Sequence, residues 1–203
     1  MSPSADRAAR IFARREVPAR ELADSAEAIA ATCHSMAVRF QRGGRLFTFG
    51  NGGAATDAQH IAVEFVHPVI VGKRALPALS LTGDVATLTG VGAVAGFDDV
   101  FAHQLHHLAQ AGDIALGVSP DGRCRNVLRG FEAARESGLL TVALLGGDGG
   151  PIAAHPALDH ALVVRSEDPR VVKEVHVTMY HVLWELVHVF FERPGVLAPD
   201  VVA

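Results

Sequence analysis

The chain has 203 residues, of which 49% are hydrophobic and 20% are charged. This composition predicts one globular domain and excludes a disordered chain, because it supplies ample apolar surface for a core. The formal net charge is −4, and the sequence contains no basic block. We therefore expect no direct contact with nucleic acid.

Three further features favour a soluble cytoplasmic protein. The first thirty residues mix arginines with acidic residues and lack the apolar run of a signal peptide. The most apolar segment, 175–191, is interrupted by histidines and a glutamate, so we expect no contact with the membrane. The two cysteines, Cys33 and Cys124, are too few for a disulfide framework, which is typical of a reducing compartment.

The hydrophobic pattern changes period along the chain. Helical periodicity covers 5–41, and we expect Pro18 to break this segment into two helices. Beyond it, short apolar runs alternate with helical patterns, and such runs are typical of strands buried on both faces of a parallel sheet. This order predicts a three-layer α/β/α sandwich around a five-stranded parallel sheet. The predicted strands are 46–49, 78–81, 114–118, 140–145 and 161–164, and the predicted helices are 54–66, 84–109, 124–137, 151–155 and 168–192.

A glycine-rich turn follows the first predicted strand. Residues 50–55 fit the pattern G-x-G-x-x-A between a strand and a helix, which is the context of a dinucleotide-binding turn. Asp84 lies too far along the chain to be the acid that such a site uses for the ribose. The turn could instead seat a phosphate or a sugar oxygen at the helix N-terminus, or its glycines could serve only to shape the turn.

The turn after the third predicted strand, 119–123, is a second candidate anion site. It begins with Ser119 and places Arg123 and Arg125 at the start of a helix. Asp121 opposes this interpretation, because a carboxylate repels a phosphate. The segment is equally compatible with an ordinary solvated turn.

Three side chains on two predicted helices form a candidate reactive group. His60 and Glu64 are four residues apart and therefore share a helix face, and His181 lies on the last helix. If these helices meet at the strand ends, two histidines and a carboxylate would suit zinc. Glu64 and His181 could instead exchange protons with a bound carbonyl compound. Single histidines on amphipathic helices are also common as packing or surface residues.

These motifs together resemble the sugar isomerase (SIS) domain family of the phosphoheptose isomerase type. The resemblance covers nearly the whole chain and implies a homotetramer of flavodoxin-like subunits with sites at subunit interfaces. It divides the single domain, 1–203, into N-terminal helices (1–42), an α/β core (45–192) and a tail (193–203). The motifs that carry it are Phe49-Gly50-Asn51-Gly52-Gly53, Asp57-Ala58-Gln59-His60 with Glu64, Gly96-Phe97-Asp98-Asp99, Gly117-Val118-Ser119, Asn126-Val127, and Glu174-Val175-His176 with His181.

The resemblance also implies roles for individual residues. Glu64 resembles the family's general base and His181 its general acid in an aldose–ketose isomerisation, such as that of sedoheptulose 7-phosphate, through an enediol. Where the family binds zinc, His60, Glu64 and His181 match three of the ligands. The residues implied to bind the sugar phosphate are Asn51, Gly52, Gly53, Ser119 and Gly122.

Several positions depart from the family pattern. Lys173 stands where the family has a glutamine ligand, and an ammonium group cannot coordinate zinc. The hydroxyl-rich phosphate loop retains Ser119 and Gly122 but contains Pro120, Asp121 and Cys124, and an Asn-Asp pair is replaced by Ala93-Val94. Phosphate affinity should fall unless Arg123, Arg125 or Lys173 supplies a replacement charge.

Two functions therefore remain open from the sequence. The first is a sugar-phosphate isomerase, because the acid/base pair is present. The second is a non-catalytic SIS homotetramer that binds phosphosugars or a protein partner, as initiator-associating members of the family do, because the phosphate loop is altered.

Overall fold

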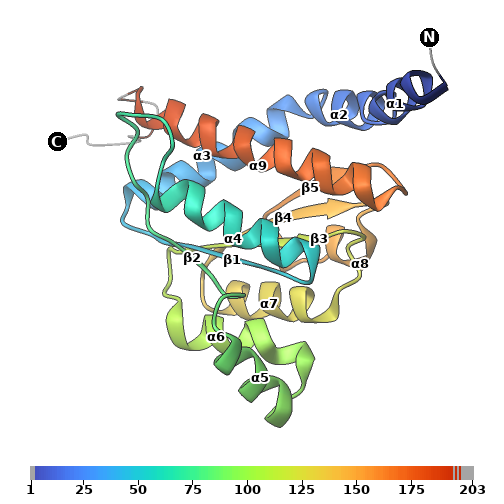
Figure 1. The fold of residues 1–203 in the computed structure, drawn as a ribbon. Coiled ribbons are helices and arrows are strands. Elements are labelled where there is room, and N and C mark those ends of the chain that lie inside the picture. Colours follow the sequence, from blue (N-terminus) through green and yellow to red (C-terminus); the bar gives the residue numbers. More distant parts are fainter. Residues whose placement is uncertain (1–2, 194, 196, 198–203) are drawn as a thin grey trace.

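The five predicted strands form one parallel sheet in the order β2-β1-β3-β4-β5 (Figure 1). The computed structural model describes residues 3–193, 195 and 197, so most of the predicted tail at 193–203 lies outside the described residues. The strand order is that of the flavodoxin-like doubly wound fold, which confirms the predicted fold class. The strands are β1 (Leu46–Gly50), β2 (Ala78–Ser80), β3 (Ile114–Ser119), β4 (Leu140–Gly146) and β5 (His160–Val164).

Every residue of the three central strands is buried, as their continuous apolar runs predict. Alternate side chains enter opposite layers: Leu46 belongs to one hydrophobic cluster and Phe47 to the other. The edge strand β2 differs from this pattern, because Leu79 is 49% exposed. A strand at the edge of a sheet is covered on fewer sides than a central strand, so its apolar run does not ensure burial.

Two helical layers cover the sheet (Figure 1). Helices α3 (Ala26–Gln41), α4 (Gly53–Val66) and α9 (Pro169–Phe191) pack on one face through the first cluster. Helices α6 (Val100–Leu108), α7 (Arg125–Glu136) and α8 (Gly150–Ala153) pack on the other face through the second cluster. Both α4 and α9 begin beside the carboxyl edge of the sheet, because each directly follows a strand or its turn.

The N-terminal segment corrects one prediction. It forms three helices, α1 (Pro3–Ala13), α2 (Glu16–Ala23) and α3, and the breaks fall near residues 14 and 24 instead of at Pro18. Pro18 is the third residue of α2. The N–H groups in the first turn of a helix have no partner within the helix, so proline is tolerated there.

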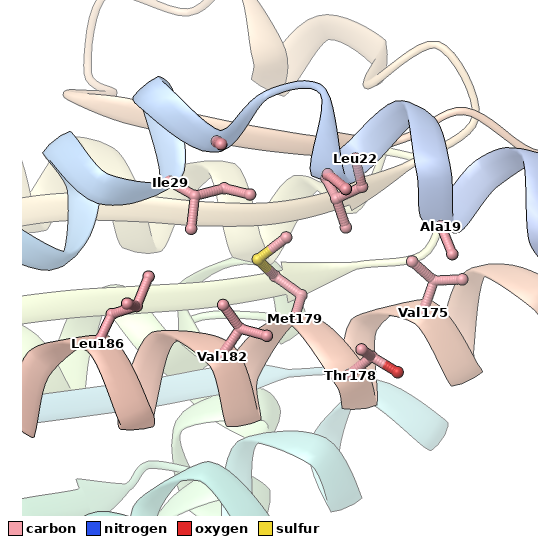
Figure 2. A pocket seen from close by; sticks show the side chains of 10 residues that line it. Ala19, Leu22, Ile29, Val175, Thr178, Met179, Val182 and Leu186 are labelled. Atoms are coloured by element: carbon pink, nitrogen blue, oxygen red, sulfur yellow. The ribbon is translucent and has the colours of Figure 1, made fainter.

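An apolar groove lies where the N-terminal helices meet α9 (Figure 2). Its volume is about 280 Å³, and Leu22, Ile29, Met179 and Leu186 are among the side chains that point into it. The groove is on the side of α9 that faces the N-terminal helices, and α4 packs against the same helix elsewhere.

The segment predicted as one helix at 84–109 is divided into three. Asp84 caps α5 (Val85–Val94) by accepting a hydrogen bond from the Thr87 N–H, and a 3-10 turn, η1 (Phe97–Asp99), leads into α6. Gly96 ends the first piece with a φ of 95°, which glycine adopts without strain. None of the helices that the structure describes is both long and apolar enough to cross a membrane.

Candidate functional site

The glycine-rich turn connects β1 to α4 at the carboxyl edge of the sheet. Gly52 has a φ of 53° and precedes the first residue of α4, Gly53. A side chain at Gly50 would place its Cβ 2.8 Å from the carbonyl oxygen of Val118 on the neighbouring strand. Two different constraints, backbone conformation and close approach, therefore require glycine in this turn.

Asn51 is held in this turn by a reciprocal pair of amide hydrogen bonds. Its Nδ2 donates to Asn126 Oδ1 at 2.7 Å, and Asn126 Nδ2 donates back to Asn51 Oδ1 at 2.8 Å. Asn126 is buried in the first turn of α7. The pair fixes the turn after β1 against the helix that follows β3.

The structure brings His60, Glu64 and His181 together. One ligand atom from each lies within 4.8 Å of the others. His60 Nε2 is 3.0 Å from Glu64 Oε1, and the rings of His60 and His181 have centroids 5.2 Å apart. The two helices do meet, with His60 and Glu64 on α4 and His181 on α9, but about two to three turns from the helix starts and not at the carboxyl ends of the strands.

The surroundings shield Glu64 and orient His181. The Glu64 side chain is 12% exposed, whereas that of His60 is 42% exposed. His181 Nδ1 is 2.7 Å from the Val177 carbonyl, to which it donates, so Nε2 is the ring nitrogen that remains for chemistry. Trp184 Nε1 donates to the Glu64 carbonyl at 2.9 Å and ties α9 to α4 at this point.

Tyr180 is a site residue that sequence reasoning missed. Its hydroxyl is 2.7 Å from His60 Nδ1, and its side chain is buried. Burial, together with the carboxylates of Asp57 and Glu64, raises the pKa of Tyr180 to about 12, so the phenol keeps its proton. The sequence offers one hint of this role, because Tyr180 directly precedes His181. Adjacent residues of a helix point in different directions, however, and the sequence does not show which of the two reaches His60.

These three side chains could hold a metal ion. Two imidazoles and one carboxylate form a three-ligand set of the kind found in catalytic zinc sites, which keep a further position open. Lys173 does not belong to this set, because its Nζ donates to Asp57 Oδ1 at 2.6 Å and to the Gly53 carbonyl at 2.9 Å. Asp57 is buried, so the pair joins the start of α4 to α9.

Lys173 also borders a small cavity of about 190 Å³ beside the glycine-rich turn. His176 lines the same cavity and is buried, with Nε2 3.0 Å from the Leu145 carbonyl. Burial lowers the pKa of His176, which therefore stays neutral and donates to this carbonyl. This contact anchors α9 to the end of β4.

The turn after β3 satisfies its own hydrogen-bonding groups. The buried Ser119 Oγ accepts from the Gly122 N–H at 3.1 Å and lies 3.4 Å from Asp121 Oδ1. The same carboxylate oxygen accepts from the Arg123 N–H at 3.0 Å. Asp121 thus occupies donors that an external anion would need.

The cations expected to replace the missing hydroxyl groups are already paired. Arg123 Nη2 donates to both carboxylate oxygens of Asp148, at 3.0 and 2.9 Å, and Arg125 is 3.1 Å from Asp98. Lys173 is paired with Asp57, as described above. Ala93 and Val94 are exposed at the end of α5 and bring no polar group to the site.

Comparison with known proteins relates this geometry to a family. The family model described as "SIS domain" matches residues 13–146. The chain is 43% identical over 182 residues to a phosphoheptose isomerase of Solidesulfovibrio magneticus, covering 89% of this chain and 88% of that protein. It is 47% identical over 148 residues to a phosphoheptose isomerase of Pelobacter propionicus, covering 73% of this chain and 77% of that protein.

Solved structures agree with the sequence relatives. The phosphoheptose isomerase from Francisella tularensis superposes with a TM-score of 0.85 at 31% identity, covering 93% of this chain and 99% of that one. The enzyme from Neisseria gonorrhoeae gives a TM-score of 0.82 at 32% identity, covering 90% and 97%. On the family match, the identities and the shared fold, this chain belongs to the SIS domain family.

Proposed function

We propose that this chain is a sugar-phosphate isomerase that interconverts an aldose and a ketose, such as sedoheptulose 7-phosphate and the corresponding heptose aldose phosphate. The observation that carries the proposal is the convergence of Glu64 and His181 between helices α4 and α9. The relatives named phosphoheptose isomerase support the same substrate class.

The reaction requires two proton transfers on neighbouring carbons. Glu64 removes a proton from C1 of the ketose, and the electrons of that C–H bond form the C1–C2 double bond of an enediol. His181 donates a proton to the former carbonyl oxygen on C2. Glu64 then returns its proton to C2, while His181 removes the hydroxyl proton on C1, which leaves the aldehyde. A shielded carboxylate beside an imidazole is a suitable pair for such general acid–base catalysis.

A zinc ion, if bound, would be held by His60, Glu64 and His181. It would supply a Lewis acid that polarises the substrate carbonyl. The contribution of the chain itself is orientation, because Val177 fixes the ring of His181 and Trp184 fixes the backbone at Glu64.

The turns at the carboxyl edge of the sheet bind the substrate in this proposal. Asn51, Gly52 and Gly53 hold the sugar through backbone groups and a helix N-terminus. Because Glu64 lies eleven residues beyond Gly53 on α4, about 16 Å along the helix, a sugar on this turn would reach the Glu64–His181 pair of a neighbouring subunit. Ser119 and Gly122 bind the phosphate in the turn after β3. The self-satisfied hydrogen bonds of that turn make phosphate binding weaker than a hydroxyl-rich loop would allow.

We further propose a cytoplasmic homotetramer. Two apolar surfaces support self-association: the groove between the N-terminal helices and α9, and helix α5, which has no buried residue despite being largely apolar. Light scattering after gel filtration tests the assembly, and a monomer at micromolar concentration would contradict it.

The non-catalytic alternative is less well supported, because the similar proteins are named as isomerases and both proton-transfer residues are present. Purified protein should be assayed with sedoheptulose 7-phosphate and with shorter sugar phosphates. We expect turnover that Glu64→Gln reduces by about 10³-fold or more, since it removes the base and keeps the shape. Turnover at an unchanged rate in this variant would refute the mechanism. If no sugar phosphate stabilises the protein in a thermal-shift screen, the result would favour the non-catalytic alternative.

A further inference from the structure

Tyr180, His60 and Glu64 form a continuous chain of hydrogen bonds. The Tyr180 hydroxyl is 2.7 Å from His60 Nδ1, and His60 Nε2 is 3.0 Å from Glu64 Oε1. The rings of Tyr180 and His60 meet edge to face, with centroids 5.2 Å apart and an angle of 75° between their planes. Both nitrogens of His60 are therefore engaged, each by a group with a different hydrogen-bonding capacity.

The burial of Tyr180 determines the direction of the first hydrogen bond. The residue is 2% exposed, so the phenol has little access to bulk water. Within the part of the chain that the structure describes, His60 Nδ1 is the hydrogen-bond partner of this hydroxyl. If Nδ1 carried a hydrogen and donated, the phenol hydrogen would be buried without an acceptor, which is unfavourable. The phenol therefore donates to Nδ1.

The second hydrogen bond follows from the first. A neutral imidazole carries one hydrogen, so an accepting Nδ1 places that hydrogen on Nε2. Nε2 then donates to Glu64 Oε1, which holds the carboxylate in one orientation. Among the described residues, none donates to the second oxygen of Glu64, so that oxygen is the one available as a base.

The same tautomer opposes metal binding by His60. A metal needs the lone pair of Nε2, so the ring hydrogen would have to move to Nδ1, where metal-bound histidines usually donate to an acceptor. Tyr180 would then have to accept this hydrogen and leave its own without a partner. Lys173, two turns before Tyr180 on α9, adds no ligand, because its ammonium group is bound to Asp57.

We propose that Tyr180 is a positioning residue that holds His60 in the Nε2–H tautomer, directs it to Glu64 and weakens the affinity of the site for a divalent metal. The proposal concerns the site of the proposed isomerase, but both tests below are made without turnover. A failed activity assay and a failed tautomer assignment are therefore separate results.

The first test is the tautomer of His60 by ¹⁵N NMR of histidine-labelled protein, at an alkaline pH where imidazole is neutral. Because the chain has 11 histidines, the ¹⁵N signals of His60 are identified as those that are missing from the spectrum of His60→Gln. We expect the protonated nitrogen to be Nε2 in the unmodified chain, and we expect that preference to weaken in Tyr180→Phe. A protonated Nδ1 in the unmodified chain overturns the proposal, even if the variant fails to fold.

The second test is the affinity for Zn²⁺, measured against a chromophoric chelator. Binding at this site is the part of the Zn²⁺ binding that is lost in Glu64→Gln. We expect Tyr180→Phe to bind about tenfold more tightly at this site than the unmodified chain, because second-shell partners change metal affinity by about that factor or more. Trp184→Phe is the matched control, since it removes an aromatic donor to Glu64 without touching the His60 nitrogens. Unchanged or weaker binding by Tyr180→Phe would mean that the phenol does not oppose the metal.

Discussion

Replacing Asp121 with serine should strengthen the binding of a phosphorylated substrate. In the turn after β3, one Asp121 oxygen accepts from the Arg123 N–H at 3.0 Å and lies 3.4 Å from Ser119 Oγ. The carboxylate therefore blocks two donors and adds a negative charge where the proposed phosphate binds. Serine removes both obstacles and adds a hydroxyl group.

The magnitude follows from two contributions. A carboxylate about 5 Å from a doubly charged phosphate costs about 1.5 kcal/mol in water-like surroundings. Releasing the N–H and the hydroxyl to the phosphate contributes about 1 kcal/mol for each hydrogen bond. Allowing for incomplete release, we expect the Kd or KM for the sugar phosphate to fall by about 10- to 100-fold, with little change in kcat.

The assay is isomerase kinetics together with calorimetric binding of a sugar phosphate. Asp121→Asn is the charge-only variant, and we expect it to give about a tenfold gain because the amide oxygen still occupies the Arg123 N–H. Asp24→Ser, in the N-terminal helices, controls for a change in net charge. If neither Asp121 variant lowers the KM, this turn does not bind the phosphate and the assignment of Ser119 is wrong.

Three further predictions concern stability and reactivity. Lys173→Met should lower the free energy of unfolding by about 1–2 kcal/mol in urea titrations, because it leaves buried Asp57 without its cation. Lys173→Gln should lower it less, because an amide still donates a hydrogen bond. Equal stability of the unmodified chain and both variants would show that the pair is unimportant. Gly122→Ala should destabilise the fold by more than about 2 kcal/mol, because this residue has a φ of 67° and its Cβ would lie 1.8 Å from a carbonyl oxygen of the adjacent loop. A melting temperature within a degree of that of the unmodified chain would refute the predicted destabilisation. Burial raises the pKa of Cys33 to about 12, so this thiol stays protonated and unreactive until the pH approaches that value. A thiol reagent at neutral pH should therefore label Cys124 alone in the folded protein. Rapid labelling of both thiols without denaturant would contradict the burial of Cys33.

The sheet could be predicted from the sequence because its central strands leave a direct signal. Runs such as 140–145 are apolar at every position, which requires cover on both faces. Contrary to the prediction, the N-terminal helices do not break at Pro18, because the effect of a proline depends on where the helix begins. The exposure of Leu79 depends on its strand lying at the edge of the sheet, and one strand's pattern does not contain that information.

The site was predictable where residues lie on one helix and less so where contacts cross between elements. His60 and Glu64 follow from helical spacing, and their meeting with His181 was conditional on packing. The hydrogen bond from Tyr180 to His60 joins residues 120 apart, which no local pattern reports. The ion pairs of Arg123 and Lys173 likewise depend on carboxylates brought in by folding, so sequence reasoning left these cations free for the substrate.

The most direct test of the account is the fate of the transferred hydrogen. Isomerisation of sedoheptulose 7-phosphate in deuterated water, followed by mass spectrometry or NMR of recovered substrate and product, reports exchange at C1 and C2. Proton transfer through an enediol by Glu64 predicts deuterium in the sugar with the unmodified chain and none with Glu64→Gln. Equal incorporation in both proteins would contradict the role assigned to Glu64, because proton exchange would then proceed without its carboxylate.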